Sequence, residues 1–200
     1  MQSLRSRIVL LGNIVSKQLV VRYFADGQAI THFDIEVKSR AADGESKHYF
    51  SIQAKGELAE RLSQGAVAGQ GIHLEGYYHQ QLNKQNQLVS SITATNADLI
   101  GTATKLYWNR SELIGQVVKR SALAKSTNDR EFIKLSLDVG SNAPIDCQLW
   151  GFPAKYLDQH GGEGSQLLLE GELRMVRGKS ADEKSVLLHG HTCIKINNPS

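Results

Sequence analysis

The residue types that could do chemistry in this sequence favour binding over catalysis. The sequence has no nucleophile elbow, no Walker loop, no HExxH motif and no pair of carboxylates at catalytic spacing. His189, His191 and Cys193 alternate along a predicted strand and should share one face, which is a start for a metal site. Any strand produces such alternation, however, and no second pair of ligands lies nearby in sequence. We therefore predict a protein that is not an enzyme and that holds neither a metal nor another cofactor.

Aromatic and basic side chains remain as candidates for a binding surface. Single-stranded nucleic acids are held by aromatic platforms under the bases and by cations along the phosphates. Tyr77 and Tyr78 are adjacent on a predicted strand and point to opposite faces, so at most one of them lies in the core. The candidate nucleic-acid-binding residues are Arg7, Arg22, Tyr23, Tyr49, Lys55, Tyr77, Lys119, Arg120, Trp150, Arg174, Arg177 and Lys179.

Structural roles compete with binding for many of these side chains. Most single lysines belong to a solvated surface. Phenylalanine is commonly buried, so we expect the core to contain Phe24, Phe33, Phe50 and Phe132. For Tyr49 and Trp150 the structural and the binding interpretations both stay open at this point.

The elements that position these residues follow from an internal repeat, because four sequence blocks occur twice in the same order. The paired blocks are residues 10–15 with 113–118, 30–37 with 132–139, 55–62 with 150–157, and 74–76 with 169–171. Loops between them differ in length, as surface loops tolerate. We therefore predict two copies of one domain, at residues 1–102 and 103–200.

Each repeat has the layout of a small closed barrel. The first strand bends at Gly12 or Gly115, and a polar hairpin follows it. The next strand alternates with a period of two, which puts Phe33, Ile35 and Val37 on a core face. A third strand leads into a short helix, and two more strands complete the repeat. The prediction is an all-β protein with one short helix per domain, folded as two tandem OB-fold five-stranded barrels. A β-sandwich would have more strands and no such helix.

Composition limits the class of protein further. The chain has 200 residues, of which 40% are hydrophobic, which is too many for a disordered chain. The longest apolar run near the N-terminus is residues 8–11, too short for a signal peptide or a membrane span. Two cysteines cannot form a disulfide framework, so we expect a cytoplasmic protein. The net charge of +3 allows a polyanionic partner without demanding one.

Several segments resemble the bacterial single-stranded DNA-binding protein family, which includes the primosomal replication proteins. In the first repeat the resemblance lies in residues 7–14, 33–37, 55–60 and 71–78, and in the second it lies in residues 149–152 and 165–174. It implies sequence-independent binding of single-stranded DNA in replication, recombination or repair. It also supports Tyr49 and Trp150 as stacking residues, since the family places aromatics near both positions. Arg174 and Lys179 would flank the loop that reaches over the ligand in OB-folds.

The resemblance also implies partners. Two barrels per chain suggest a homodimer, which would reproduce the four-barrel arrangement of the family. Replication or repair proteins are expected partners as well, although the sequence has no acidic tail of the kind the family uses to recruit them. RNA stays open as a second ligand, because stacking barely distinguishes the two sugars. The alternative function is a replisome or primosome adaptor whose OB-folds mainly bind proteins.

Overall fold

The computed structural model describes residues 6–41, 44–82, 88–177 and 184–196 of the chain. Contacts between residues divide it into two compact units. The N-terminal unit comprises Ile8–Tyr78 and Ser90–Asn109, and the C-terminal unit comprises Arg110–Ser200 with the short segments Met1–Arg7 and His79–Val89. The predicted domain boundary between residues 102 and 103 stays a prediction.

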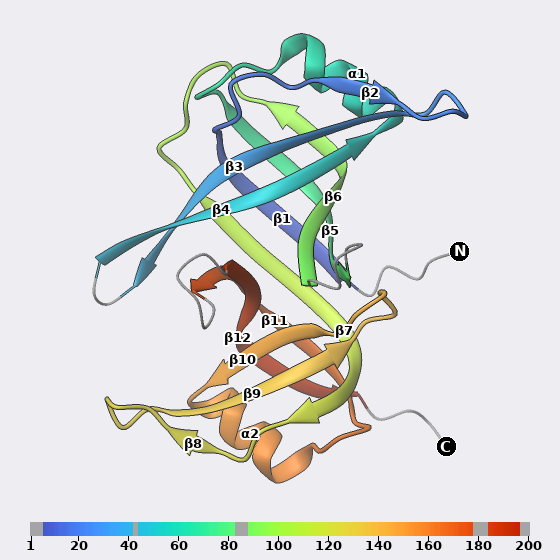
Figure 1. Cartoon of the computed structure of the whole chain (residues 1–200). Coiled ribbons are helices and arrows are strands. Elements are labelled where there is room, and N and C mark those ends of the chain that lie inside the picture. The colour runs from blue at the N-terminus through green and yellow to red at the C-terminus, as the bar shows by residue number, and fades with distance from the viewer. Residues whose placement is uncertain (1–5, 42–43, 83–87, 178–183, 197–200) are drawn as a thin grey trace. The chain divides into compact units, whose positions relative to one another are not determined.

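The N-terminal unit contains a closed five-stranded barrel with a short extra strand (Figure 1). The barrel strands follow the order β1–β3–β4–β6–β5, and β1 pairs with β3 to close the ring. Strand β1 pairs with β3 and β5, and β3 pairs with β2 and β4, all in antiparallel orientation. Strands β4 and β6 are parallel, with Ile52 opposite Ile92. The elements are β1 (Ser6–Ile14), β2 (Val21–Tyr23), β3 (Ala29–Ala41), β4 (Gly44–Lys55), α1 (Gly56–Gly65), β5 (Gly71–Leu82) and β6 (Leu88–Leu99).

The C-terminal unit repeats this topology. Its barrel follows the order β7–β9–β10–β12–β11, closed by pairing of β7 with both β9 and β11. The parallel pair recurs between β10 and β12, with Cys147 opposite Leu188. The elements are β7 (Trp108–Arg120), β8 (Ala124–Lys125), β9 (Glu131–Asp138), β10 (Ile145–Trp150), α2 (Phe152–His160), β11 (Gln166–Arg177) and β12 (Lys184–Ile196). Both units therefore have the predicted OB-fold, with one helix between the third and fourth barrel strands.

The core of each barrel follows from the alternation of its strands. Phe33, Ile35 and Val37 are buried, as the period of two predicts. Tyr78 is buried and Tyr77 is partly exposed, which confirms that only one of this pair enters the core. Phe50 is buried as well, so the expectation for it and for Phe33 is confirmed.

Two phenylalanines depart from the predicted core. Phe24 is 50% exposed, because the chain turns at this point: the Phe24 carbonyl accepts a hydrogen bond from the Gly27 amide. Phe132 is only partly buried, and its ring packs against that of Trp150 on the outer surface of the barrel. Both expectations were wrong because the sequence pattern does not show where a strand ends or which face a neighbouring ring covers.

Glycine allows the strands to meet where each barrel closes. A Cβ at Gly12 would collide with the backbone carbonyl of Glu36, and one at Gly115 would collide with that of Asp138. Both glycines lie where the first strand of the barrel approaches the second. The sequence predicted a bend at these glycines, and the close approach of the two backbones is the reason why glycine is needed there.

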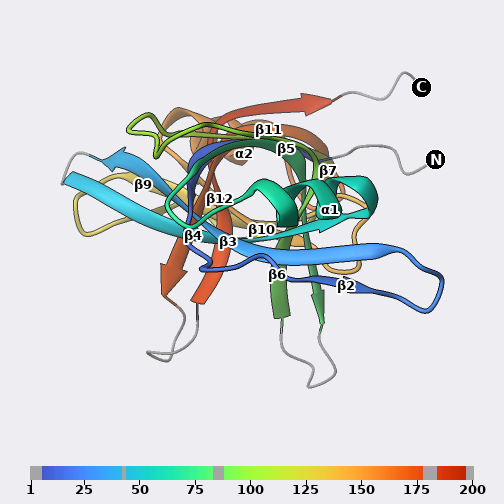
Figure 2. The same cartoon turned by 90° about the horizontal axis from the view of Figure 1, so that it is seen from above.

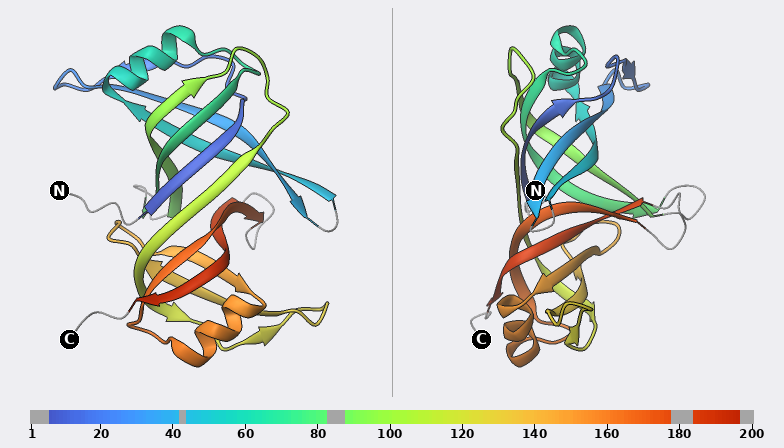
Figure 3. Two further views of the ribbon diagram at one scale, coloured as in Figure 1. Left: turned by 180° about the vertical axis from the view of Figure 1, so that it is seen from behind. Right: turned by 90° about the vertical axis from the view of Figure 1, so that its left-hand side faces the viewer.

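The two helices cover one end of their barrels (Figures 2 and 3). In α1 the buried side chains are Ala59 and Leu62, and in α2 they are Pro153, Ala154 and Leu157. Leu58 of α1 is only partly buried. Each helix therefore uses one narrow apolar stripe to close its barrel.

Candidate nucleic-acid interface

Three rings form a row on the outer surface of the C-terminal unit, one on each of the neighbouring strands β9, β10 and β12. Trp150 lies directly opposite Phe132, and their ring centroids are 5.0 Å apart. His189 packs on the other side of Trp150, with a centroid distance of 6.3 Å. The plane of the Trp150 ring is inclined by 37° to that of Phe132 and by 31° to that of His189. We call Phe132, Trp150 and His189 the ring row.

Cations accompany the ring row. The guanidinium of Arg130 lies 5.4 Å from the Trp150 ring centroid, and the Lys134 ammonium lies 6.0 Å from that of Phe132. Such cations are attracted by the negative face of an aromatic ring. On the neighbouring strand β11, the Arg174 guanidinium lies 3.4 Å from the Glu172 carboxylate. The arrangement combines flat surfaces for bases with positive charge for phosphates.

Two donors at this surface lack an acceptor in the part of the chain that the structure describes. They are Trp150 Nε1 and Arg174 Nε, both covered from solvent by surrounding atoms. A covered donor without a partner costs about 1–3 kcal/mol relative to a satisfied one. A ligand that brings acceptor oxygens or nitrogens to this surface, with a small movement of the side chains, would remove that cost.

His189 supplies a neutral ring to the row. Burial is the largest cause that lowers its pKa, and Arg174, His191 and Arg130 add repulsion, so the pKa falls from 6.5 to about 4. The imidazole is therefore uncharged at neutral pH, and its ring can pack against Trp150 without the penalty of a partly buried charge.

The lowered pKa predicts a pH dependence of stability. In the unfolded chain His189 takes up a proton near its ordinary pKa of 6.5, but in the folded chain it does so only near 4. The folded state therefore loses stability as the pH falls from about 6.5 to about 4. Replacing His189 by asparagine should flatten this part of the curve, measured as urea midpoints across that range.

The exposed Lys195 provides a control on the same strand, because it is not among the groups that lower the pKa of His189. Its replacement by asparagine should leave the slope between pH 6.5 and 4 as it is in the parent chain. Equal slopes for the parent and the His189→Asn variant would contradict the assignment.

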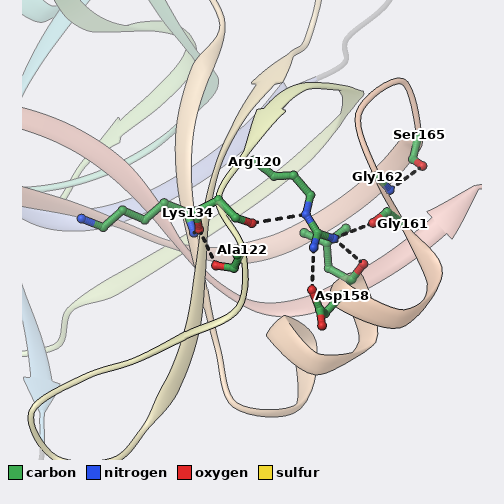
Figure 4. Close-up of polar contacts among 9 residues, drawn as sticks. Arg120, Ala122, Lys134, Asp158, Gly161, Gly162 and Ser165 are labelled. Atoms are coloured by element: carbon green, nitrogen blue, oxygen red, sulfur yellow. Dashed lines mark hydrogen bonds and ion pairs between the residues drawn. The ribbon is translucent and has the colours of Figure 1, made fainter.

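Arg120 has a structural role that the sequence did not predict. Its guanidinium points to the C-terminal end of α2, where Nη1 donates to the carbonyls of Leu157 and Gly161 at 3.0 and 2.6 Å (Figure 4). Nη2 forms an ion pair of 2.5 Å with Asp158. These carbonyls carry the negative end of the helix dipole, which a cation stabilises. Arg120 therefore holds α2 in place, and its binding of DNA stays a prediction.

The equivalent outer face of the N-terminal unit carries charges instead of a ring row. Ile30 lies between Arg22 on β2 and Lys55 on β4, directly opposite both. Next to them the Gln53 amide and the His32 ring are hydrogen bonded at 2.9 Å. Burial lowers the pKa of His32, and Arg22 and Lys55 lower it further, so both cations lie close to this ring.

Tyr49 and Tyr23 are exposed, but their hydroxyls already have partners. Tyr49 donates to Glu36 at 2.9 Å, and Lys47 lies 3.2 Å from the same carboxylate. Tyr23 donates to Glu60 at 3.3 Å. The bond to Glu36 is also the main reason why the pKa of Tyr49 is raised.

The other predicted residues are scattered. Arg7 and Lys119 are exposed on β1 and β7, and Tyr77 is partly exposed on β5. Lys179 and the side chain of Arg177 lie outside the described residues. The structure thus brings Trp150 and Arg174 together around His189, and Arg22 and Lys55 together around His32. Sequence reasoning missed Phe132, His189 and Arg130 as members of one surface. One signal was available for Arg130, because it directly follows the polar hairpin of the second repeat and is therefore expected to be exposed.

The predicted shared face of His189, His191 and Cys193 is wrong. The pairing of β11 with β12 shifts by one residue, since Gly171 lies opposite Gly190 while Glu170 lies opposite Thr192. This bulge at His191 turns Cys193 into the core, where burial raises its pKa to about 11, while His189 stays outside. Within the described ranges, no group of three or more His, Cys, Asp or Glu side chains is arranged to hold a metal.

The helices of the described chain include none with the length and apolar character needed to cross a membrane. The buried Cys147 is also far from reactive, because burial raises the pKa of its thiol well above the ordinary value.

Two OB-fold barrels in one chain, with a ring row and cations on an outer barrel face, define a protein of the OB-fold nucleic-acid-binding class. The model of the single-strand binding protein family matches residues 5–100. The N-terminal half of the chain is therefore similar in sequence to this family, and the second half repeats the fold of the matched half.

Solved structures agree with this fold. The wild-type single-stranded DNA-binding protein of Thermus aquaticus aligns with a TM-score of 0.82 at 18% identity, covering 98% of this chain and 94% of its own. A deletion mutant of the same protein aligns with a TM-score of 0.81 at 17% identity, covering 98% and 96%. No curated protein matched the sequence.

Proposed function

We propose that this protein binds single-stranded DNA without strong sequence preference and acts in DNA replication, recombination or repair. The ring row of Phe132, Trp150 and His189 is the observation that carries the proposal. The match of residues 5–100 to the single-strand binding protein family supports the choice of ligand and favours it over a protein adaptor.

The mechanism is capture without chemistry on the ligand. Arg130, Lys134 and Arg174 attract phosphates to the outer face of the C-terminal unit. Bases then stack on the exposed parts of the ring row, because every base has a flat face. Stacking does not read the hydrogen-bonding edges of the bases, which explains weak sequence preference.

Titration of the whole chain with a labelled oligo-dT tests this proposal. The logarithm of the association constant should fall linearly with the logarithm of salt concentration, with a slope of about −0.7 per phosphate contacted. Comparing oligo-dU with the RNA oligo-U as competitors tells whether the 2′-hydroxyl matters. Undetectable binding at low salt, or binding that ignores salt, would contradict the proposal.

We also propose that the protein forms a homodimer in the cytoplasm. An apolar row on the outer face of the C-terminal unit supports the dimer: Ile114 and Ile194 lie on either side of Leu168 across three strands. The two isoleucines are 42% and 48% exposed. A second copy is the occupant we expect, and light scattering should give twice the mass of the chain.

A further inference from the structure

The two units present different side chains at equivalent outer positions. Ile30 and Lys55 of the N-terminal repeat correspond to Phe132 and Trp150 of the C-terminal repeat. Strand register agrees, because Ile30 faces Lys55 just as Phe132 faces Trp150. Lys55 lies directly before α1, and Gly151 alone separates Trp150 from α2, so the two pairs occupy the same place on the two barrels.

The position before the helix is aromatic in one unit and cationic in the other. Trp150 joins two further rings at 5.0 and 6.3 Å, and a cation lies over it. Lys55 is exposed beside Ile30, which is 7% exposed and offers no ring. Of the two equivalent positions, that of the C-terminal unit alone carries an aromatic pair.

Two exposed cationic side chains, Arg22 and Lys55, lie at the same position of the N-terminal unit. Arg22 and Lys55 flank Ile30 on the same face, because residues directly opposite each other on paired strands point to the same side. Neither has an ion-pair partner among the described residues, whereas Lys38 and Lys47 are paired with Glu45 and Glu36.

The aromatic side chains of the N-terminal unit do not replace the missing rings. Tyr49 lies beside the Glu36 carboxylate, which repels a phosphate backbone. The described ring pair of this unit, His48 with Phe50, consists of two buried side chains. Tyr23 donates a hydrogen bond from its hydroxyl to the Glu60 carboxylate.

We propose that the two units divide the contacts with single-stranded DNA by chemistry. The C-terminal unit stacks bases on the ring row beside its own phosphate-attracting cations, whereas the N-terminal unit contacts phosphates alone, through Arg22 and Lys55. This inference rests on the proposed function, because it assumes that the chain binds single-stranded DNA.

The test compares oligo-dT with an abasic phosphodiester of equal length, by fluorescence anisotropy of the labelled strand. The parent chain should bind oligo-dT more tightly than the abasic strand. Trp150→Ala should reduce that ratio and leave the salt slope unchanged. Arg22→Gln with Lys55→Gln should weaken both strands by the same factor and reduce the size of the slope by about 1.4, for two contacts of about 0.7 each.

Control variants show whether a change in DNA binding arises from the proposed contacts or from loss of charge or of folding in general. Lys17→Gln with Lys105→Gln removes two exposed lysines from the same unit. This variant should leave the ratio of the two affinities unchanged and should reduce the salt slope by less than the Arg22→Gln and Lys55→Gln variant does. Trp150→Phe keeps a ring and should restore part of the ratio. Circular dichroism of each variant shows whether it is folded, and Trp150→Phe carries the test if Trp150→Ala is not.

The outcomes separate the inference from the proposed function. If the parent chain binds neither strand, both are wrong. If it binds oligo-dT and the abasic strand equally, or if the Arg22 and Lys55 variant changes the ratio instead of the slope, the division of contacts is wrong while DNA binding stands.

Discussion

Replacing Trp150 by alanine is expected to weaken binding of oligo-dT about 5- to 150-fold. A base stacked on an aromatic side chain contributes about 1–3 kcal/mol, and each 1.4 kcal/mol is about tenfold in affinity. Trp150 is the centre of the ring row, because its ring contacts both Phe132 and His189 and lies under Arg130. Its loss therefore removes one stacking surface and leaves the rings of Phe132 and His189 without the ring that lies between them.

The measurement uses the two tryptophans of the chain. A Trp108→Phe variant leaves Trp150 as the single indole, and its fluorescence should be quenched as oligo-dT is added. Trp108→Ala is the matched control for affinity, since Trp108 is 55% exposed at the start of β7 and belongs to the N-terminal unit. If Trp108→Ala weakened binding as much as Trp150→Ala, the ring row would lose its central role.

Replacing Arg120 by alanine should lower the free energy of unfolding of the C-terminal unit by about 2–4 kcal/mol. The change removes hydrogen bonds to two carbonyls at the end of α2 and the ion pair with Asp158. Hydrogen bonds from a charged group contribute about 1.5–3 kcal/mol, and the helix dipole adds up to about 1. The side chain is only 17% exposed, so water replaces these bonds poorly.

Urea denaturation followed by circular dichroism measures this loss. The exposed neighbour Lys119 is the control, and Lys119→Ala should change the free energy of unfolding by less than about 0.5 kcal/mol. DNA affinity of the Arg120→Ala variant, measured where it is fully folded, tests the sequence-based prediction separately. A selective loss of affinity without a loss of stability would place Arg120 in the binding surface and contradict its role at the helix.

The sequence alone determined the architecture of this protein. The repeated blocks predicted two domains of one kind, and the period of two in residues 30–37 predicted a strand with one buried face, which the burial of Phe33, Ile35 and Val37 confirms. These features could be read because they depend on spacing within a few residues, where strand geometry leaves little choice. The position of the helix before the fourth strand completed the prediction of an OB-fold.

Only the tertiary structure decided which side chains share a surface. Phe132, Trp150 and His189 come from three strands far apart in sequence, and their meeting depends on the register of β9 with β10 and of β10 with β12. One extra residue at His191 sends Cys193 inward, and the approach of α2 to β7 makes Arg120 a support for the helix. Register, bulges and helix docking are set by closure of the whole barrel, so a local pattern predicts the strands but not the surface that they build together.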